Sequence, residues 1–265
     1  MKKIFDNEIE IIDFFQSVQS SEILLLPEND KEVEDICLSV HDDDRWRKWI
    51  DSSGKGDPPP DFYCEELKLM MDVMRVDDHG HIGKNGKSIV NPTLQRESAV
   101  MRDLEKRGVL DMFPGVPIHL LVDTGLPTDE DHNYEFYRDN FLRTVKSHIG
   151  KIKTYQTNHP GFKTIFFIFD ESSFYFETIS DYKPRHKGEG ALGQMHLWFL
   201  DKEFIKVFER AEIDYVIWFT PYKRCLELGD KEKVVPCPKV VVYNVKEWLG
   251  LAREYNAKHM VSSEL

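Results

Sequence analysis

Cysteine is scarce in this chain, and long apolar runs are missing. The four cysteines, at positions 37, 64, 225 and 237, form no CxxC pair and are too few to cross-link 265 residues, so we expect reduced thiols. No run of about 18 apolar residues is present, as a membrane span would need. Acidic residues follow the first methionine before any signal-peptide apolar region could form. These absences predict a cytoplasmic protein without a membrane segment.

Several common catalytic motifs are also missing. The chain contains no GxxxxGK[ST], no GxGxxG after a strand, no GxSxG and no HExxH. These absences give no support to a P-loop nucleotide site, a dinucleotide site, a hydrolase nucleophile elbow or a zincin metal site.

Basic residues are outnumbered. The formal net charge is −12, and residues 1–60 hold 15 acidic against 7 basic residues, so this segment alone supplies −8. Such a field repels nucleic acid at long range and favours a basic partner. A metal-dependent nuclease nevertheless needs carboxylates in its own site, so the charge leaves local phosphate chemistry open.

The apolar pattern predicts an α/β fold. With 41% hydrophobic residues the chain can bury a large core. Helical spacing of apolar residues predicts a helix over residues 4–18 and either one bent helix or two short ones over residues 33–50. A loop rich in glycine and proline follows at residues 51–60. Apolar strands are expected at 117–122, 163–169, 215–219 and 239–243, with helices between them. We predict one domain, residues 1–265, with an acidic helical extension over 1–57 and, over 58–257, a mixed sheet that has an early antiparallel hairpin and helices on both faces.

Local signals predict further element boundaries. Asn91-Pro92 opens a helix that ends at Gly108, and Thr128 caps a long helix that extends to residue 152. Phe174 to Phe176 resemble an antiparallel return after the 163–169 strand, and the tail from Lys258 is expected to fray.

The segment from Pro60 to Val76 predicts a β-hairpin with a carboxylate on each arm. Side chains alternate along a strand, so Met70, Asp72 and Met74 share one face. If residues 65–68 form the turn, Asp61 lies opposite Asp72. Two adjacent carboxylates can hold a divalent metal ion.

This hairpin resembles the core of the PD-(D/E)xK phosphodiesterase superfamily, where Pro-Asp opens one strand and Asp/Glu-x-Lys lies on the next. The resemblance implies an upstream helix, the hairpin, a helix and a strand, in that order, through about residue 122. It also implies Mg²⁺ or Mn²⁺ on Asp61 and Asp72, with Glu34 (or Glu32) as a further acid. Met74 occupies the position of the family's lysine, so Lys68 is the substitute we predict for orienting the nucleophile.

Other polar groups are weaker candidates. Asp77-Asp78-His79-Gly80-His81 follows the hairpin and could extend a metal site, and Asp123 and Asp170-Glu171 end apolar strands, where α/β sheets place their ligand crevice. Lys223 and Arg224 could clamp a phosphate, although surface cations of this kind often only face solvent. Asp131-His132 is interpreted as a helix-capping segment.

Two functions follow from these patterns. The first is a metal-dependent phosphodiesterase, a nuclease-like hydrolase acting on nucleic acid. The second is a non-catalytic acidic interaction protein, such as an inhibitor or accessory subunit, that binds a basic partner through residues 1–60. The paired acids favour the first function, and the missing lysine favours the second.

Overall fold

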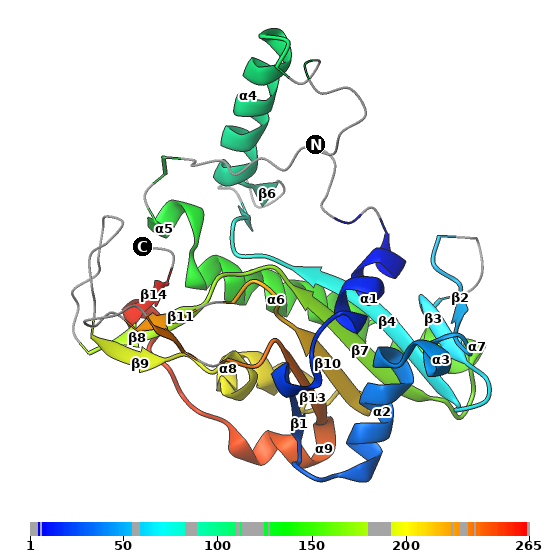
Figure 1. Ribbon diagram of the computed structural model, residues 1–265. Coiled ribbons are helices and arrows are strands. Elements are labelled where there is room, and N and C mark those ends of the chain that lie inside the picture. The colour runs from blue at the N-terminus through cyan, green and yellow to red at the C-terminus, as the bar shows by residue number, and fades with distance from the viewer. Residues whose placement is uncertain are drawn as a thin grey trace.

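A seven-stranded mixed sheet, in the order β1-β13-β10-β7-β4-β3-β2, forms the centre of the computed structural model (Figure 1). Its strands are β1 (Ile23–Leu26), β2 (Ile50–Asp51), β3 (Phe62–Cys64), β4 (Leu69–Val76), β7 (Lys163–Asp170), β10 (Tyr215–Phe219) and β13 (Val240–Asn244). The neighbours β4, β7 and β10 run parallel, whereas β3 is antiparallel to β4 and β13 is antiparallel to β10. The structure describes residues 5, 7–54, 59–82, 89–109, 112, 125–126, 128–179, 192–223, 225–227, 233–235 and 237–263.

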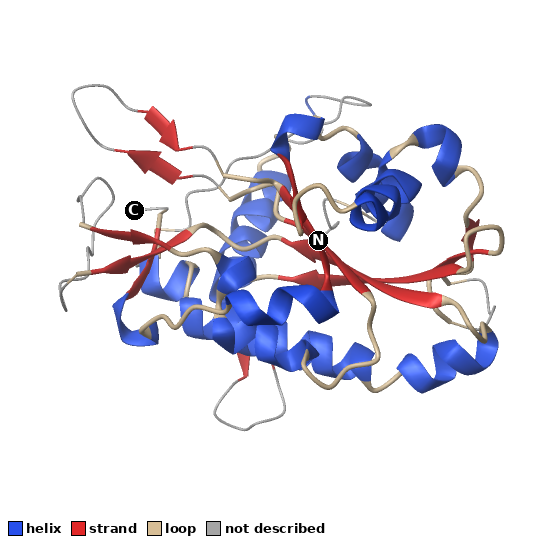
Figure 2. Ribbon diagram, turned by 90° about the horizontal axis from the view of Figure 1, so that it is seen from below, coloured by secondary structure: helices blue, strands red, loops and turns tan. Residues whose placement is uncertain are grey.

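Helices cover both faces of this sheet, as Figure 2 shows. One face packs against α1 (Glu8–Gln16), α2 (Lys31–His41) and α3 (Asp43–Trp46), and the other packs against α6 (Tyr134–Ile149), α7 (Ile152–Asn158), α8 (Lys202–Ile205) and α9 (Val245–Trp248). Strand β4 illustrates the division, because Met71 and Val73 join the core under α1 to α3 while Met70 and Met74 join the core under α6. The predicted α/β class, mixed sheet and N-terminal helices are confirmed.

The hairpin has the predicted turn and register. Strand β3 ends at Cys64 and β4 begins at Leu69, which leaves residues 65–68 for the turn. Phe62 pairs with Met71 and Cys64 pairs with Leu69, so Asp61, one residue before β3, faces Asp72. In a hairpin the length of the turn fixes the register, and a one-residue slip would have moved every side chain of β4, Asp72 included, to the opposite face.

Side-chain caps set several helix boundaries. Asp30 caps α2 and Asp42 caps α3, so the predicted 33–50 helix is two short helices. α4 (Pro92–Lys106) begins after its cap Asn91, and Figure 1 shows it projecting from the body of the molecule. The long helix expected from Thr128 is divided into α5 (Thr128–Asp131), α6 and α7. The division occurs because the Asn133 side chain accepts the N–H groups of the first turn of α6 and thereby starts a new helix.

The remaining strands form small sheets: β5 (His81–Ile82) with β6 (Ile89–Val90), β11 (Cys225–Glu227) with β12 (Lys233–Val235), and β14 (Met260–Ser262) with β8 (Tyr175–Thr178) and β9 (Gly193–Met195). Two predictions are therefore corrected. The return after β7 pairs with β14 and β9 instead of β7, and the tail is not frayed at Met260 and Val261, because both side chains are buried. The strand expected at 117–122 lies outside the described residues. Among those that are described, no helix has the length and apolarity that crossing a bilayer requires.

Candidate functional site

Asp72 lies at the centre of the first polar cluster, on the β4 face that packs against α6. It is buried, and its Oδ2 accepts a hydrogen bond of 2.8 Å from the Tyr155 hydroxyl and contacts Nδ1 of His148. His148 lies in the last turn of α6 and Tyr155 lies on α7. Two helices that are distant in sequence thus supply the partners of the predicted carboxylate.

Asp61 is the second carboxyl group of this cluster. Its Oδ2 accepts the backbone N–H of Val73 at 2.8 Å. Burial raises the pKa of Asp61 to about 7, and the charge and hydrogen bond of Asp72 add to the rise. The register makes Asp61 and Asp72 cross-strand neighbours, because Phe62 pairs with Met71.

Lys68 does not join this cluster, contrary to our prediction. It lies in the hairpin turn with a φ of 52°, its Nζ is 2.9 Å from Glu65 Oε2, and it lies over the Phe162 ring. Because the backbone turns at this residue, strand alternation does not extend to it. Lys68 and Asp72 are also four positions apart along the chain, which corresponds to about 13 Å in an extended strand.

The predicted acid Glu34 is on the wrong side of the sheet. It is exposed on α2, and α2 packs its buried face against the sheet face opposite Asp72. Glu32, on the same helix, pairs with Lys163. Neither acid can therefore ligate an ion held by Asp72, because the sheet lies between them.

Lys223 is interior, which corrects its prediction as a surface phosphate clamp. Its Nζ donates to Ser172 Oγ and to the Ser173 carbonyl at 2.9 Å, and it lies 3.6 Å from Asp170 Oδ2. The ammonium also lies over the ring of Tyr137, 4.6 Å from its centroid. Burial lowers the pKa of Lys223, and the nearby carboxylate of Asp170 opposes that change. Arg224 lies outside the described residues.

Asp170 ends β7 and belongs to a larger group of buried polar side chains at the carboxyl ends of the parallel strands. Its Oδ2 accepts hydrogen bonds from Tyr137 (2.5 Å) and from Trp218 Nε1 (3.0 Å). A neighbouring carboxylate, Asp201, contacts Nε2 of His196 at 2.8 Å. The edge of the sheet where α/β proteins commonly bind ligands is therefore rich in buried ionisable groups. Asp123, another candidate, lies outside the described residues.

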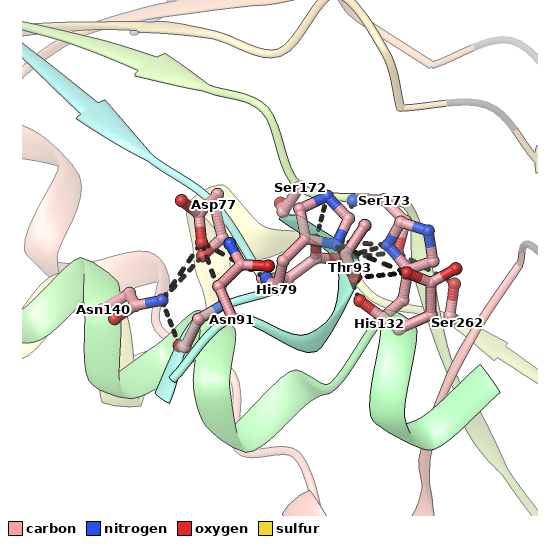
Figure 3. Close-up of polar contacts among 12 residues, drawn as sticks. Asp77, His79, Asn91, Thr93, His132, Asn140, Ser172, Ser173 and Ser262 are labelled. Atoms are coloured by element: carbon pink, nitrogen blue, oxygen red, sulfur yellow. Dashed lines mark hydrogen bonds and ion pairs between the residues drawn. The ribbon is translucent and has the colours of Figure 1, made fainter. Parts of the chain in front are cut away.

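Asp78, His79 and His132 form the second cluster, two residues beyond the end of β4 (Figure 3). Asp78 Oδ1 is 3.2 Å from His132 Nδ1 and 3.6 Å from His79 Nε2. Burial alone would raise the pKa of Asp78, but the hydrogen bond and charge of His132, with the charge of His79, hold it below its ordinary range. One ligand atom from each residue lies within 4.8 Å of the others, so the group can hold a metal ion.

Hydrogen bonds fix the orientation of this cluster. Asp78 Oδ2 accepts from the N–H and Oγ of Ser173, both at 2.9 Å, and from the Tyr175 hydroxyl at 2.7 Å. The Asp131 carbonyl lies 2.7 Å from Nδ1 of His79. The two imidazole rings are partly exposed, 25% for His79 and 13% for His132, so the cluster reaches the surface through them.

Sequence reasoning found part of each cluster. The 77–81 segment was a candidate, but His132 was interpreted as a helix-capping residue, and nothing indicated that it lies beside Asp78. Its position in the first turn of the predicted helix was the available signal, because helix starts and strand ends often meet at one edge of an α/β sheet. His148 and Tyr155 carried no comparable signal.

The chain was compared with known proteins in three ways. No protein-family model matches it, and searches of curated proteins and of solved structures find no match either.

Proposed function

We propose that the protein is a metal-dependent phosphodiesterase that acts on nucleic acid, with Asp61 and Asp72 as the cation ligands. The observation that supports this most is the pairing of the two carboxyl groups across β3 and β4. The order α2, hairpin, α6, β7 also agrees with the element order of the PD-(D/E)xK superfamily. That order is completed at residue 170, later than the expected 122.

The carboxyl pair has the donor chemistry that a hard cation needs. Asp72 Oδ2 takes the hydrogen bond of Tyr155 and the contact with His148. Carboxylate oxygens are preferred by Mg²⁺ and Mn²⁺. Such an ion would activate water and neutralise charge on the phosphate.

His148 would take the place of the family's lysine, since Met74 is buried and apolar at that position. Its Nδ1 faces the Asp72 carboxylate, which orients the ring and leaves Nε2 as the nitrogen that can accept a proton from water. The side chain is 19% exposed, so the ring is accessible from solvent.

The alternative, an acidic protein that binds a basic partner through residues 1–60, receives less support. Two acidic side chains of this segment are paired with cations from outside it: Glu22 with Lys239 (2.7 Å) and Glu32 with Lys163. These pairs reduce the field that a basic partner would meet.

Cleavage assays test the proposal. Purified protein is incubated with plasmid DNA or single-stranded RNA and Mg²⁺ or Mn²⁺. Asp72→Asn, which removes one ligand charge, should reduce cleavage by at least about 100-fold, and His148→Gln should reduce it by about 10²–10⁴-fold, the usual contribution of a general base.

The matched control is Asp139→Asn, which neutralises an aspartate that is 65% exposed on the same helix, α6. It should leave cleavage unchanged. Circular dichroism should confirm that each variant is folded. Equal cleavage by Asp72→Asn and the unsubstituted protein would refute the proposal, as would the absence of cleavage with either metal on both substrates.

A further inference from the structure

The cluster of Asp78, His79 and His132 has no part in the proposed hydrolysis. Asp72 and Val76 are four positions apart on β4, which corresponds to about 13 Å, and Asp78 lies two residues further along the chain. One metal ion cannot contact both Asp72 and Asp78. The second cluster therefore needs its own explanation.

The distances within the cluster suit a small divalent ion. Ligand atoms that are about 2.0–2.2 Å from a zinc-type ion, at tetrahedral or right angles to each other, lie about 2.8–3.6 Å apart. The distances from Asp78 Oδ1 to His132 Nδ1 and to His79 Nε2 are 3.2 Å and 3.6 Å. All three ligand atoms lie within 4.8 Å of one another, close enough to converge on one ion.

The surrounding hydrogen bonds direct the three ligand atoms toward one another. Ser173 and Tyr175 donate to Oδ2 of Asp78 and hold the carboxylate beside His132, whose Nδ1 lies 3.2 Å from each of its two oxygens. The Asp131 carbonyl lies against Nδ1 of His79, which favours the tautomer whose Nε2 has a lone pair. Metal-binding histidines commonly have this backbone support.

We infer that Asp78, His79 and His132 bind one divalent transition metal ion of the zinc class, independently of the carboxyl pair. Two imidazoles and one carboxylate suit Zn²⁺, Fe²⁺, Co²⁺ or Ni²⁺ better than Mg²⁺, which prefers oxygen. Three protein ligands are also the number that leaves a coordination position for water. The ion would join the end of β4 to the segment that precedes α6.

Metal binding by the full chain, without an affinity tag, tests the inference: the protein is stripped by dialysis against chelator and then reloaded with Zn²⁺ or Co²⁺ and freed of excess metal. We expect one Zn²⁺ per chain by elemental analysis, and a Co²⁺ absorption spectrum typical of nitrogen and oxygen ligands. His132→Gln and His79→Gln should each weaken Zn²⁺ binding by more than about 100-fold, which exceeds the 10–100-fold loss expected for a supporting contact. Tyr175→Phe, which removes such a contact, should weaken binding within that 10–100-fold range.

The matched control is His41→Gln, on the opposite side of the sheet, where the ring lies 2.9 Å from the Val18 carbonyl. It should bind Zn²⁺ like the unsubstituted protein, and so should Asp139→Asn, at an exposed aspartate of α6 that belongs to neither cluster. If His132→Gln fails to fold, His79→Gln decides the question, because that side chain is the more exposed. Zn²⁺ stoichiometry well below one in the unsubstituted protein, or equal affinity in the folded histidine variants, would overturn the inference.

Discussion

The two faces of the central sheet bury different chemistry. Under α1, α2 and α3 the buried core consists of aliphatic and aromatic side chains with the thiols of Cys37 and Cys64 and the Tyr215 phenol, and no described carboxylate, imidazole or ammonium group is buried there. Under α6 to α9 the sheet buries a whole set of charged or titratable groups: Asp72, Asp78, His159, Asp170, His196, Asp201 and Lys223.

We expect the α1–α3 face to contribute mainly to stability, and the α6 face to hold the groups that the proposed functions need. Burying a charge is costly unless hydrogen bonds and counterions compensate for it, and replacing buried ion pairs with apolar residues is often neutral or stabilising. The α1–α3 face buries no described charged group and therefore avoids this desolvation cost. The α6 face keeps both clusters described above, and we therefore expect substitutions on the two faces to have different effects.

The largest effect is expected for Asp170→Ala. This substitution leaves Lys223 buried without its nearest carboxylate and removes the acceptor of Tyr137 and Trp218. Breaking a buried pair in this way should lower the free energy of unfolding by about 3–5 kcal/mol, measured by urea denaturation. The isosteric Asp170→Asn, which keeps an acceptor oxygen, should lose less. An Asp170→Ala protein as stable as the original would show that the polar network is not coupled to the fold.

A smaller effect is expected on the apolar face. Ile12→Val deletes one methylene group from a fully buried side chain of α1 and should cost about 0.5–1.5 kcal/mol in urea denaturation. Nucleic-acid cleavage and Zn²⁺ binding should stay at the level of the unsubstituted protein, because the sheet separates this residue from both clusters. Loss of either activity in a folded Ile12→Val protein would contradict the division between the two faces.

The smallest effect concerns pH. Burial lowers the pKa of His196 below that of an unfolded histidine, and the charge of Lys223 lowers it further. The contact between His196 and Asp201 opposes this change. Below about pH 6.5 the unfolded chain takes up a proton that the folded protein does not, so His196 makes stability fall as the pH drops from about 6.5.

His196→Gln retains a donor for Asp201 but cannot titrate. Comparing urea denaturation at pH 7.5 and pH 5.5, we expect the variant to lose less stability than the unsubstituted protein. Because every other titrating group is common to both proteins, a parallel loss would show that His196 is not held neutral in the folded state.

The sequence predicted the elements that depend on local physics. The turn expected at residues 65–68 gave the register that pairs Asp61 with Asp72, and Asn91 begins α4 as its capping chemistry requires. Contacts between distant elements were not predictable. His148 reaches Asp72 across 76 residues and His132 reaches Asp78 across 54, and helical periodicity does not specify which turn of a helix faces which strand residue.

Both clusters depend on the same two rigid elements. β4 carries Asp72 and leads directly to Asp78, while α6 follows His132 and contains His148 in its last turn. A helix of 16 residues is about 24 Å long and resists compression, as a paired strand does. The spacing between the clusters is therefore a built-in length of the scaffold, and the surface loops can change in length or sequence without bringing the two clusters closer together.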